Sequence, residues 1–186
     1  NYTVGGEQKK WQPKNYGGNF QGIVSLRDSL VQSRNLSTLN LVTDVGVNTT
    51  TDDLKRYGFK DIVDNLSVTL GSMSVNLVEF SQAYTIFSNN GVQVKPYIVE
   101  QIVNKDGKSV TFEPQRKELN PPEQSYLITS ILKDVVTKGT GRRAAVDGIE
   151  LAGKTGTTND NIDDWLCGHT PSIQTIVWFG NDNKTP

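Results

Sequence analysis

Three strand-like runs near the C-terminal end constrain the fold of this 186-residue chain more than any other feature. The first run covers residues 149–158, and the second and third cover 164–170 and 173–181. The segments between the runs are short, and the first of them, 159–163, reads as a polar turn. Because strands joined by short turns pair in an antiparallel manner, the pattern predicts a small antiparallel meander.

The first of these runs carries a group of side chains suited to an anionic ligand. Lys154 supplies a cation, Thr155 and Thr157 supply hydroxyls, and Gly156 lets a substrate lie close to the strand. Charge and hydroxyl contacts of this kind bind carboxylates. A lone Lys-Thr-Gly tripeptide is a weak signal, because an ordinary strand that ends in a turn has the same composition.

Composition and charge exclude several classes of function. Charged residues make up 21% of the chain and the formal net charge is −1, so no nucleic-acid partner is expected. No apolar run approaches the length that spans a bilayer, and no signal peptide opens the sequence. The one cysteine, Cys167, excludes an internal disulfide and is predicted to be a buried thiol, and the one histidine, His169, is predicted to be structural. No cysteine or histidine cluster has metal-ligand spacing, so the sequence offers no metal site.

Helical periodicity dominates the rest of the chain. Helices are predicted at 25–32, 38–45, 52–57, 76–89 and 121–138. Their core-facing side chains are predicted to be Leu77, Phe80, Tyr84 and Phe87 on the fourth helix and Leu127, Ile128, Ile131, Leu132 and Val135 on the fifth. Short strands are expected at 92–95, 98–103 and 110–112, with a hairpin turn at 104–107, and residues 1–20 are expected to be loop. No repeat or linker divides the chain, so the sequence predicts one α/β (α+β) domain in which helices pack on antiparallel strands.

Two short motifs are candidates for chemistry outside the strands. Ser33-Arg34-Asn35 separates two predicted helices, where its serine and asparagine either project into one cleft or cap a helix. On local sequence alone the capping interpretation is favoured. Ser130 and Lys133 have Ser-x-x-Lys spacing, which places a lysine one helical turn from a serine. A structural role is favoured for this pair, because it lies in mid-helix and nothing nearby in sequence would remove the proton of the lysine.

Taken in their order along the chain, the short motifs resemble the transpeptidase domain of class A (bifunctional) penicillin-binding proteins. The resemblance covers nearly the whole chain and rests on the following segments: Trp11-x-Pro13-x-Asn15-Tyr16, Ser25-Leu26-Arg27, Ser33-Arg34-Asn35, Leu70-Gly71-Ser72, Ala83-Tyr84 with Phe87, Asn90-Gly91, Gly139-Thr140-Gly141, Lys154-Thr155-Gly156-Thr157-Thr158 and Asp164-Trp165-Leu166-Cys167-Gly168-His169-Thr170-Pro171. An ordered set of motifs is more specific than any single tripeptide. It implies a fold of the penicillin-binding protein and serine β-lactamase type, in which an antiparallel sheet packed by helices adjoins an all-helical subdomain. It also reverses the preference for capping at residues 33–35.

The resemblance implies a reaction and roles for the first motif. Members of this family cross-link peptidoglycan stem peptides. A serine attacks the penultimate D-Ala carbonyl, D-Ala leaves, and an amine of a neighbouring stem peptide takes the acyl group; β-lactams acylate the same serine. By motif match, Ser33 would relay a proton to the leaving amine. Asn35 would hold the substrate amide and orient the lysine that accompanies the nucleophile.

The resemblance also implies roles for the Lys-Thr-Gly strand. Lys154 would attract the substrate carboxylate and polarise Ser33. The hydroxyls of Thr155 and Thr157 would bind that carboxylate, and the Thr157 backbone N–H would form half of the oxyanion hole. Gly156 would keep the strand open to the ligand.

One departure from the family pattern concerns the nucleophile. In the family a Ser-x-x-Lys serine precedes the Ser-x-Asn motif, and no Ser-x-x-Lys precedes Ser33 here. Ser130 falls in the long helix that the family has just upstream of its Lys-Thr-Gly strand. Residues 1–186 are therefore expected to be the C-terminal portion of a single transpeptidase domain, without its N-terminal strands, nucleophile helix and C-terminal helix. The missing N-terminal segment, on the same or a separate chain, is an expected partner, and the isolated chain is expected to be inactive and to need that segment for stability.

The leading functional hypothesis is a peptidoglycan D,D-transpeptidase that works through a serine acyl-enzyme and uses neither a metal nor an organic cofactor. It would be a periplasmic protein anchored to the membrane by a segment outside this sequence, with stem peptides and β-lactams as its ligands. Two alternatives stay open. One is a hydrolase of the same fold, a D,D-carboxypeptidase or β-lactamase, and the resemblance argues against it through the Ser-Arg-Asn motif and the loop at 11–16. The other is a non-catalytic module that senses β-lactams or muropeptides without turnover.

Overall fold

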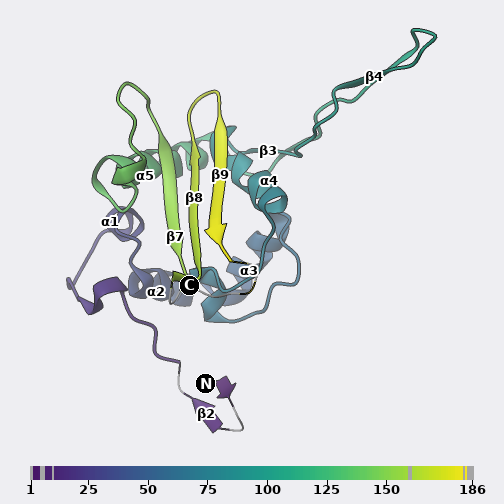
Figure 1. The fold of residues 1–186 in the computed structure, drawn as a ribbon. Coiled ribbons are helices and arrows are strands. Elements are labelled where there is room, and N and C mark those ends of the chain that lie inside the picture. The colour runs from purple at the N-terminus through teal and green to yellow at the C-terminus, as the bar shows by residue number, and fades with distance from the viewer. Residues whose placement is uncertain (1, 5–6, 10, 159–160, 182, 184–186) are drawn as a thin grey trace.

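The computed structural model describes residues 2–4, 7–9, 11–158, 161–181 and 183. Its helices are α1 (Leu26–Val31), α2 (Asn35–Val45), α3 (Val47–Arg56), α4 (Leu77–Ser88) and α5 (Pro122–Lys138), with short 3-10 helices η1 (Tyr16–Gly18), η2 (Leu66–Leu70) and η3 (Arg142–Ala144). Its strands are β1 (Tyr2–Val4), β2 (Glu7–Lys9), β3 (Val92–Val94), β4 (Gln101–Val103), β5 (Ser109–Thr111), β6 (Arg116–Glu118), β7 (Ala152–Thr157), β8 (Asp163–His169) and β9 (Gln174–Gly180). Figure 1 shows the sheet of β7, β8 and β9 in front of α5 and α4, with α1, α2 and α3 grouped beside and below it. The predicted class, an antiparallel sheet packed by helices beside a helical part, is confirmed.

The central sheet is the antiparallel meander that the C-terminal pattern predicts. Its strand order is β7-β8-β9, and its register places Lys154 opposite Cys167 and aligns Thr155 with Leu166 and Val177. Cys167 is 4% exposed, whereas Val177 is 47% exposed, so one face of the described sheet is covered and the other is open. Because successive residues of a strand point to opposite faces, Lys154 lies on the covered face and Thr155 on the open face.

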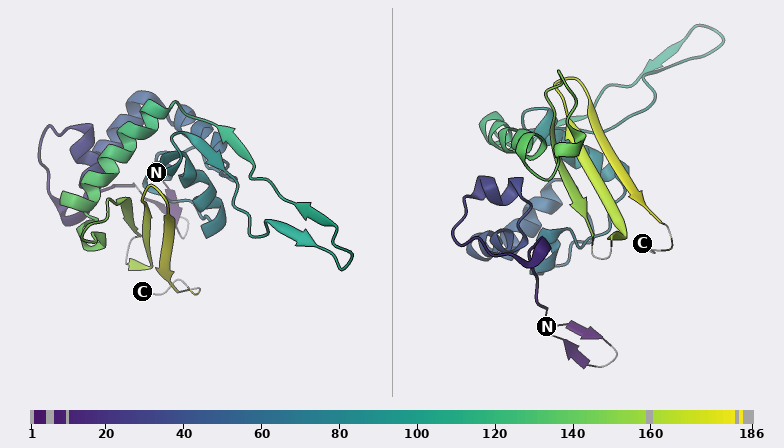
Figure 2. Two further views of the ribbon diagram at one scale, coloured as in Figure 1. Left: turned by 90° about the horizontal axis from the view of Figure 1, so that it is seen from above. Right: turned by 60° about the vertical axis from the view of Figure 1, so that its left-hand side comes forward.

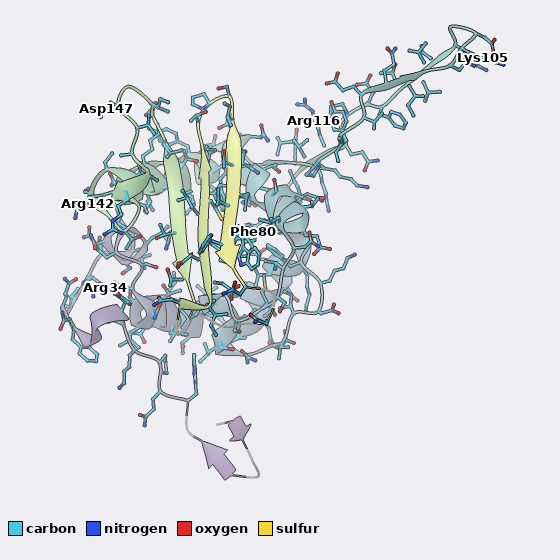
Figure 3. All side chains as sticks on the ribbon, in the orientation of Figure 1. Arg34, Phe80, Lys105, Arg116, Arg142 and Asp147 are labelled. Atoms are coloured by element: carbon cyan, nitrogen blue, oxygen red, sulfur yellow. The ribbon has the colours of Figure 1, made fainter. Side chains whose placement is uncertain are left out.

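The covered face packs against α4 and α5, which lie together on that side of the sheet (Figure 2). The buried centre consists of Tyr84, Leu132, Ala152 and Cys167, surrounded by Phe80, Phe87, Ile128, Trp165 and Ile176. Phe80 of α4 lies beside the sheet (Figure 3), with its ring centroid 5.6 Å from that of Trp165. The hydroxyl of Tyr84 donates to the backbone carbonyl of Cys167 at 3.2 Å. Burial of these apolar surfaces holds β7 in a fixed position relative to both helices.

Cys167 and His169 are both buried in this core. Their exposed fractions are 4% and 6%, and the His169 ring lies edge-on to Tyr84 at 5.9 Å between centroids. Burial raises the pKa of the Cys167 thiol to about 12. Burial, together with the charge of Lys133, lowers the pKa of His169. The prediction of a buried thiol is confirmed, and both side chains are uncharged at neutral pH.

Side-chain caps begin two of the helices, α1 and α4, at the first residues of the ranges predicted from the sequence. The Ser25 hydroxyl accepts a hydrogen bond from the Asp28 backbone N–H at 3.0 Å and caps α1. The Asn76 side chain accepts from the Glu79 N–H at 2.9 Å and caps α4. Gly46 separates α2 from α3 with a φ of 101°, a conformation that favours glycine. These caps satisfy backbone groups that the helix ends leave unpaired.

Several predicted boundaries were wrong. Residues 1–20, expected to be loop, contain the paired strands β1 and β2 and the 3-10 helix η1. The helices expected from residues 38 and 52 begin earlier, at Asn35 and Val47. Their first turns contain weak helix formers, and tertiary packing, here of α2 against α1 and α3, overrides such local propensity. Strand β6 was missed because its Arg-Lys-Glu sequence has no strand signal, and it pairs with β3. The turn expected at 159–163 includes residues 159–160, which lie outside the described part of the chain.

The prediction that Leu77 and Leu127 lie in the core was also wrong. Leu77 is 42% exposed and Leu127 is 58% exposed, whereas Leu132, Val135 and Val136 of α5 are at most 4% exposed. At about 100° per residue, Leu127 is rotated roughly 140° from Leu132 around the helix axis, so it lies off the buried stripe. The periodicity located α5 correctly and misjudged the width of its apolar face.

Strands β4 and β5 form an arm that extends away from the body, and Figure 3 labels Lys105 near its tip. The predicted hairpin turn is confirmed: the Asn104 N–H donates to the Lys108 carbonyl at 2.9 Å, and Gly107 has a φ of 77°. Apolar side chains such as Ile102 and Val110 are 55% and 57% exposed on this arm.

Candidate active site

Lys154 and Ser33 meet through a hydrogen bond that joins the two predicted motifs. The Lys154 ammonium donates to Ser33 Oγ at 2.8 Å, across 121 positions of sequence. The same Nζ donates to the Thr155 carbonyl oxygen at 2.7 Å. The ammonium therefore lies between strand β7 and the segment Ser33-Arg34-Asn35, which we call the Ser-Arg-Asn corner.

The corner that carries Ser33 is a tight connection between α1 and α2. Ser33 has a φ of 52°, and the Arg34 N–H donates to the Ser29 carbonyl oxygen at 2.8 Å. A left-handed conformation costs a residue with a side chain about 1–2 kcal/mol, and such strain is common at functional sites. The N-cap of α2 is Arg34, without a side-chain capping bond. The Ser33 hydroxyl thus contacts Lys154 instead of capping a helix.

The charge state of Lys154 is unusual. Burial disfavours its charged form and lowers its pKa to about 8. The nearby Cys167 thiol stays protonated, because its own pKa is raised to about 12 by burial, and so it provides no countercharge. Near pH 8 the Lys154 side chain is present in comparable amounts as ammonium and amine, which suits a group that takes part in proton transfer.

Residues 155–157 form the accessible part of β7. Thr155 and Thr157 share the open face, and Thr155 Oγ1 lies 2.8 Å from Thr140 Oγ1. Gly156 and Thr157 are exposed, and a Cβ added at Gly156 would have Trp165 Cβ, at 3.5 Å, as its nearest neighbour. Within the described sheet β7 pairs only with β8, so its other edge can accept an extended peptide.

Asn35 is tied to the N-terminal loop. Its Nδ2 donates to the Lys14 carbonyl oxygen at 2.8 Å, and the neighbouring Leu36 N–H donates to Asn15 Oδ1 at 3.1 Å. The hydrogen bonds of the described residues therefore join Ser33 to Lys154 but join Asn35 to the loop at 11–16. This loop is one of the segments that carry the resemblance, and the sequence does not predict its contact with Asn35.

Ser130 and Lys133 lie outside this arrangement. The Arg27 guanidinium donates to Ser130 Oγ at 3.1 Å and pairs with Asp134 at 2.7 Å. Lys133 forms an ion pair with Glu150. Both side chains have structural partners, in agreement with the interpretation favoured from the sequence.

Thr140 is the residue that sequence reasoning missed. Its signal was the Gly-Thr-Gly motif, since paired glycines often mark close packing of backbone.

In the described residues, no cluster of three histidine, cysteine or acidic side chains is placed to bind a metal ion. A search of the same residues finds no helix with the length and apolar character to cross a bilayer.

Comparison with known proteins agrees with the motif pattern. Residues 1–179 match the family described as the penicillin binding protein transpeptidase domain. Penicillin-binding protein 1A of Neisseria gonorrhoeae is 34% identical over 181 residues, which cover 92% of this chain and 23% of that protein. Penicillin-binding protein 1A of Pseudomonas aeruginosa is 30% identical over 228 residues, which cover 94% of this chain and 28% of that protein. The chain thus spans about a quarter of the length of these relatives.

Solved structures have the same fold. The crystal structure of penicillin-binding protein 1A from Haemophilus influenzae matches with a TM-score of 0.89 at 27% identity, over 95% of this chain and 33% of that one. An imipenem acyl-enzyme complex of penicillin-binding protein A from M. tuberculosis matches with a TM-score of 0.82 at 18% identity, over 93% and 46%, which is a likeness of fold. Sequence and fold therefore agree, and this chain belongs to the transpeptidase domain family of class A penicillin-binding proteins.

Proposed function

We propose that this chain forms part of the active site of a peptidoglycan D,D-transpeptidase that works through a serine acyl-enzyme. The observation that carries the proposal is the 2.8 Å hydrogen bond from Lys154 Nζ to Ser33 Oγ, which joins the two motifs. Family membership supports the reaction class. The accessible hydroxyls on edge strand β7 support a peptide substrate that ends in a free carboxylate.

Ser33 and Asn35 act on the leaving group and the substrate amide in this proposal. A serine on an upstream segment attacks the penultimate D-Ala carbonyl, and the C–N bond to the terminal D-Ala breaks as the departing nitrogen gains a proton. Lys154 donates to Ser33 Oγ, which leaves the Ser33 O–H free to donate that proton and to recover another from the upstream lysine. Asn35 uses one amide hydrogen on the Lys14 carbonyl, so its second hydrogen and its Oδ1 can contact the substrate amide.

The Lys-Thr-Gly strand binds the carboxylate of the terminal D-Ala. Lys154 supplies positive charge, and the Thr155 and Thr157 hydroxyls donate hydrogen bonds. Gly156 has no side chain to obstruct a peptide lying along the edge of β7. The Thr157 backbone N–H is half of the oxyanion hole that stabilises the tetrahedral intermediate. The acceptor amine then takes the acyl group and regenerates the serine.

The rest of the domain comes from outside residues 1–186. The open face of the described sheet exposes Val177 by 47% and Phe179 by 79%, and such apolar surface is normally covered. We infer that upstream strands and the nucleophile helix, and a helix that follows, complete the domain in a membrane-anchored protein on the outer side of the cytoplasmic membrane. Gel filtration and thermal unfolding of the isolated chain test this inference. A monomeric, cooperative transition of ordinary domain stability would contradict it.

Labelling with fluorescent penicillin tests the proposed reaction. The isolated chain is expected not to label covalently, and the full-length protein is expected to label and to cross-link lipid-linked substrate. Ser33→Ala in the full-length protein is expected to slow acylation strongly, whereas Thr43→Ala on the exposed side of α2 serves as a control. Labelling followed by hydrolysis without cross-linking would identify a carboxypeptidase or β-lactamase. Stable labelling without turnover of peptide substrate would identify a sensor.

A further inference from the structure

The turn at residues 139–141 connects both halves of the candidate site. It follows α5, and the Thr140 backbone N–H donates to the Val31 carbonyl oxygen at the end of α1, at 3.3 Å. The N–H groups of Gly139 and Gly141 both donate to the Val135 carbonyl oxygen, at 3.1 and 3.0 Å. Val31 is two residues before Ser33, so the turn is anchored next to the Ser-Arg-Asn corner.

Two glycines make this close packing possible. A Cβ added at Gly139 would lie 2.4 Å from the Val31 carbonyl oxygen and 2.9 Å from Val135 Cα. A Cβ added at Gly141 would lie 3.2 Å from the Val135 carbonyl oxygen. The backbone on both sides of Thr140 is therefore fixed against α1 and α5, and the position of the Thr140 side chain is fixed with it.

The Thr140 hydroxyl is directed at the Lys-Thr-Gly strand. Its Oγ1 lies 2.8 Å from Thr155 Oγ1, a contact between residues 15 positions apart. Other threonine hydroxyls, such as those of Thr38, Thr43 and Thr50, bond to a carbonyl in their own helix. Thr140 instead binds a side chain on another element, at an exposed point of the site.

The two hydroxyls can form a directed chain of hydrogen bonds. Each hydroxyl has one hydrogen to donate and lone pairs to accept with. If Thr140 donates to Thr155 Oγ1, the Thr155 hydrogen remains free to point at an anion, and the first bond polarises the second. The opposite direction would direct the Thr155 hydrogen away from the ligand.

We propose that Thr140 is a positioning residue for carboxylate binding: its hydroxyl donates to Thr155 and directs the Thr155 O–H toward the terminal carboxylate of the substrate or of a penicillin. This inference rests on the proposed function of the Lys-Thr-Gly strand. It adds a third hydroxyl, from the turn after α5, to a subsite otherwise made by β7. It also gives a role to the side chain of Thr140, whose two neighbouring glycines pack closely against α1 and α5.

The test compares two ligands that differ only in the carboxylate, benzylpenicillin and its methyl ester, on the full-length protein. Thr140→Val keeps the shape of the side chain and removes the hydroxyl. It is expected to lower the second-order acylation rate constant for benzylpenicillin about fivefold, the effect of one lost hydrogen bond, and to leave the rate for the ester unchanged. Thr140→Ser is expected to restore the rate. Thr137→Val, in the exposed last turn of α5, is the matched control and is expected to change neither rate.

Three outcomes would overturn the inference and leave the proposed function standing. Equal losses for both ligands would make Thr140 a structural residue, and an unchanged benzylpenicillin rate in Thr140→Val would give its hydroxyl no role. Failure of Thr140→Ser to restore the rate would attribute the effect to shape instead of the hydroxyl. Absence of acylation in the unmodified full-length protein would instead refute the proposed function, and the inference with it. A thermal unfolding curve of each variant distinguishes a local effect from misfolding.

Discussion

Gly139→Ala is expected to destabilise the domain and disturb the site at once. The added Cβ would lie 2.4 Å from the Val31 carbonyl oxygen, 2.8 Å from Val31 Cγ1 and 2.9 Å from Val135 Cα. Two of these three atoms belong to the backbone, so no side-chain rotation can relieve the overlap. The φ of Gly139 is −105°, which is not in the left-handed region that favours glycine, so the expected penalty is assigned to these steric contacts.

The size of the effect follows from two opposing contributions. Overpacking of this kind costs about 1–3 kcal/mol, and contact with rigid backbone places Gly139→Ala at the upper end. Alanine also reduces the conformational entropy of the unfolded chain, which stabilises the folded domain by about 0.4–1 kcal/mol. The expected net loss is about 2 kcal/mol, which corresponds to a fall in Tm of about 4–8 °C for a domain of about 150–250 residues.

Thermal unfolding of the complete domain, followed by circular dichroism, measures this loss. Gly156→Ala is the matched control, because its Cβ would meet only Trp165 Cβ, at an ordinary 3.5 Å, and its Tm is expected to stay within about 2 °C of the unmodified domain. Gly139→Ala should also slow acylation by displacing Val31 and, through it, Ser33 from Lys154. A Tm for Gly139→Ala equal to that of the control would refute the close packing of the turn against α1.

Three further predictions concern other parts of the structure. The rate of acylation by benzylpenicillin is expected to fall as the pH rises through about 8, where Lys154 loses its proton. Lys154→Arg is expected to move this fall in rate to higher pH. A pH–rate profile without such a fall would contradict the charge assigned to Lys154. Ser130→Ala is expected to leave penicillin labelling intact, because the Ser130 hydroxyl accepts from Arg27; loss of labelling would show that Ser130 is the nucleophile. Tyr84→Phe is expected to cost about 1 kcal/mol in denaturant unfolding, because it removes a buried hydrogen bond to the Cys167 carbonyl; an unchanged midpoint would show that this bond contributes nothing.

Local chemistry made much of the fold predictable. The strands β7, β8 and β9 follow from apolar runs separated by turn residues, and α4 begins at Asn76 because an asparagine side chain can pair with a free N–H three residues on. These signals act within a few residues of the chain, so they can be read without knowing what packs against them. The same is not true of Leu77 and Leu127, whose exposure depends on which helix face meets the sheet.

Local sequence signals were enough to predict the antiparallel meander, the capped helices and an ordered set of motifs from which the family could be identified. Which of these polar residues meet depends on how the elements pack in three dimensions. This packing pairs Lys154 with Ser33 and Thr155 with Thr140, joins Asn35 to the loop at 11–16, and gives Ser130 a structural partner. These contacts arise between elements far apart in sequence, and so does the desolvation that lowers the pKa of Lys154. Packing of the whole core, and not local propensity, brings such elements together.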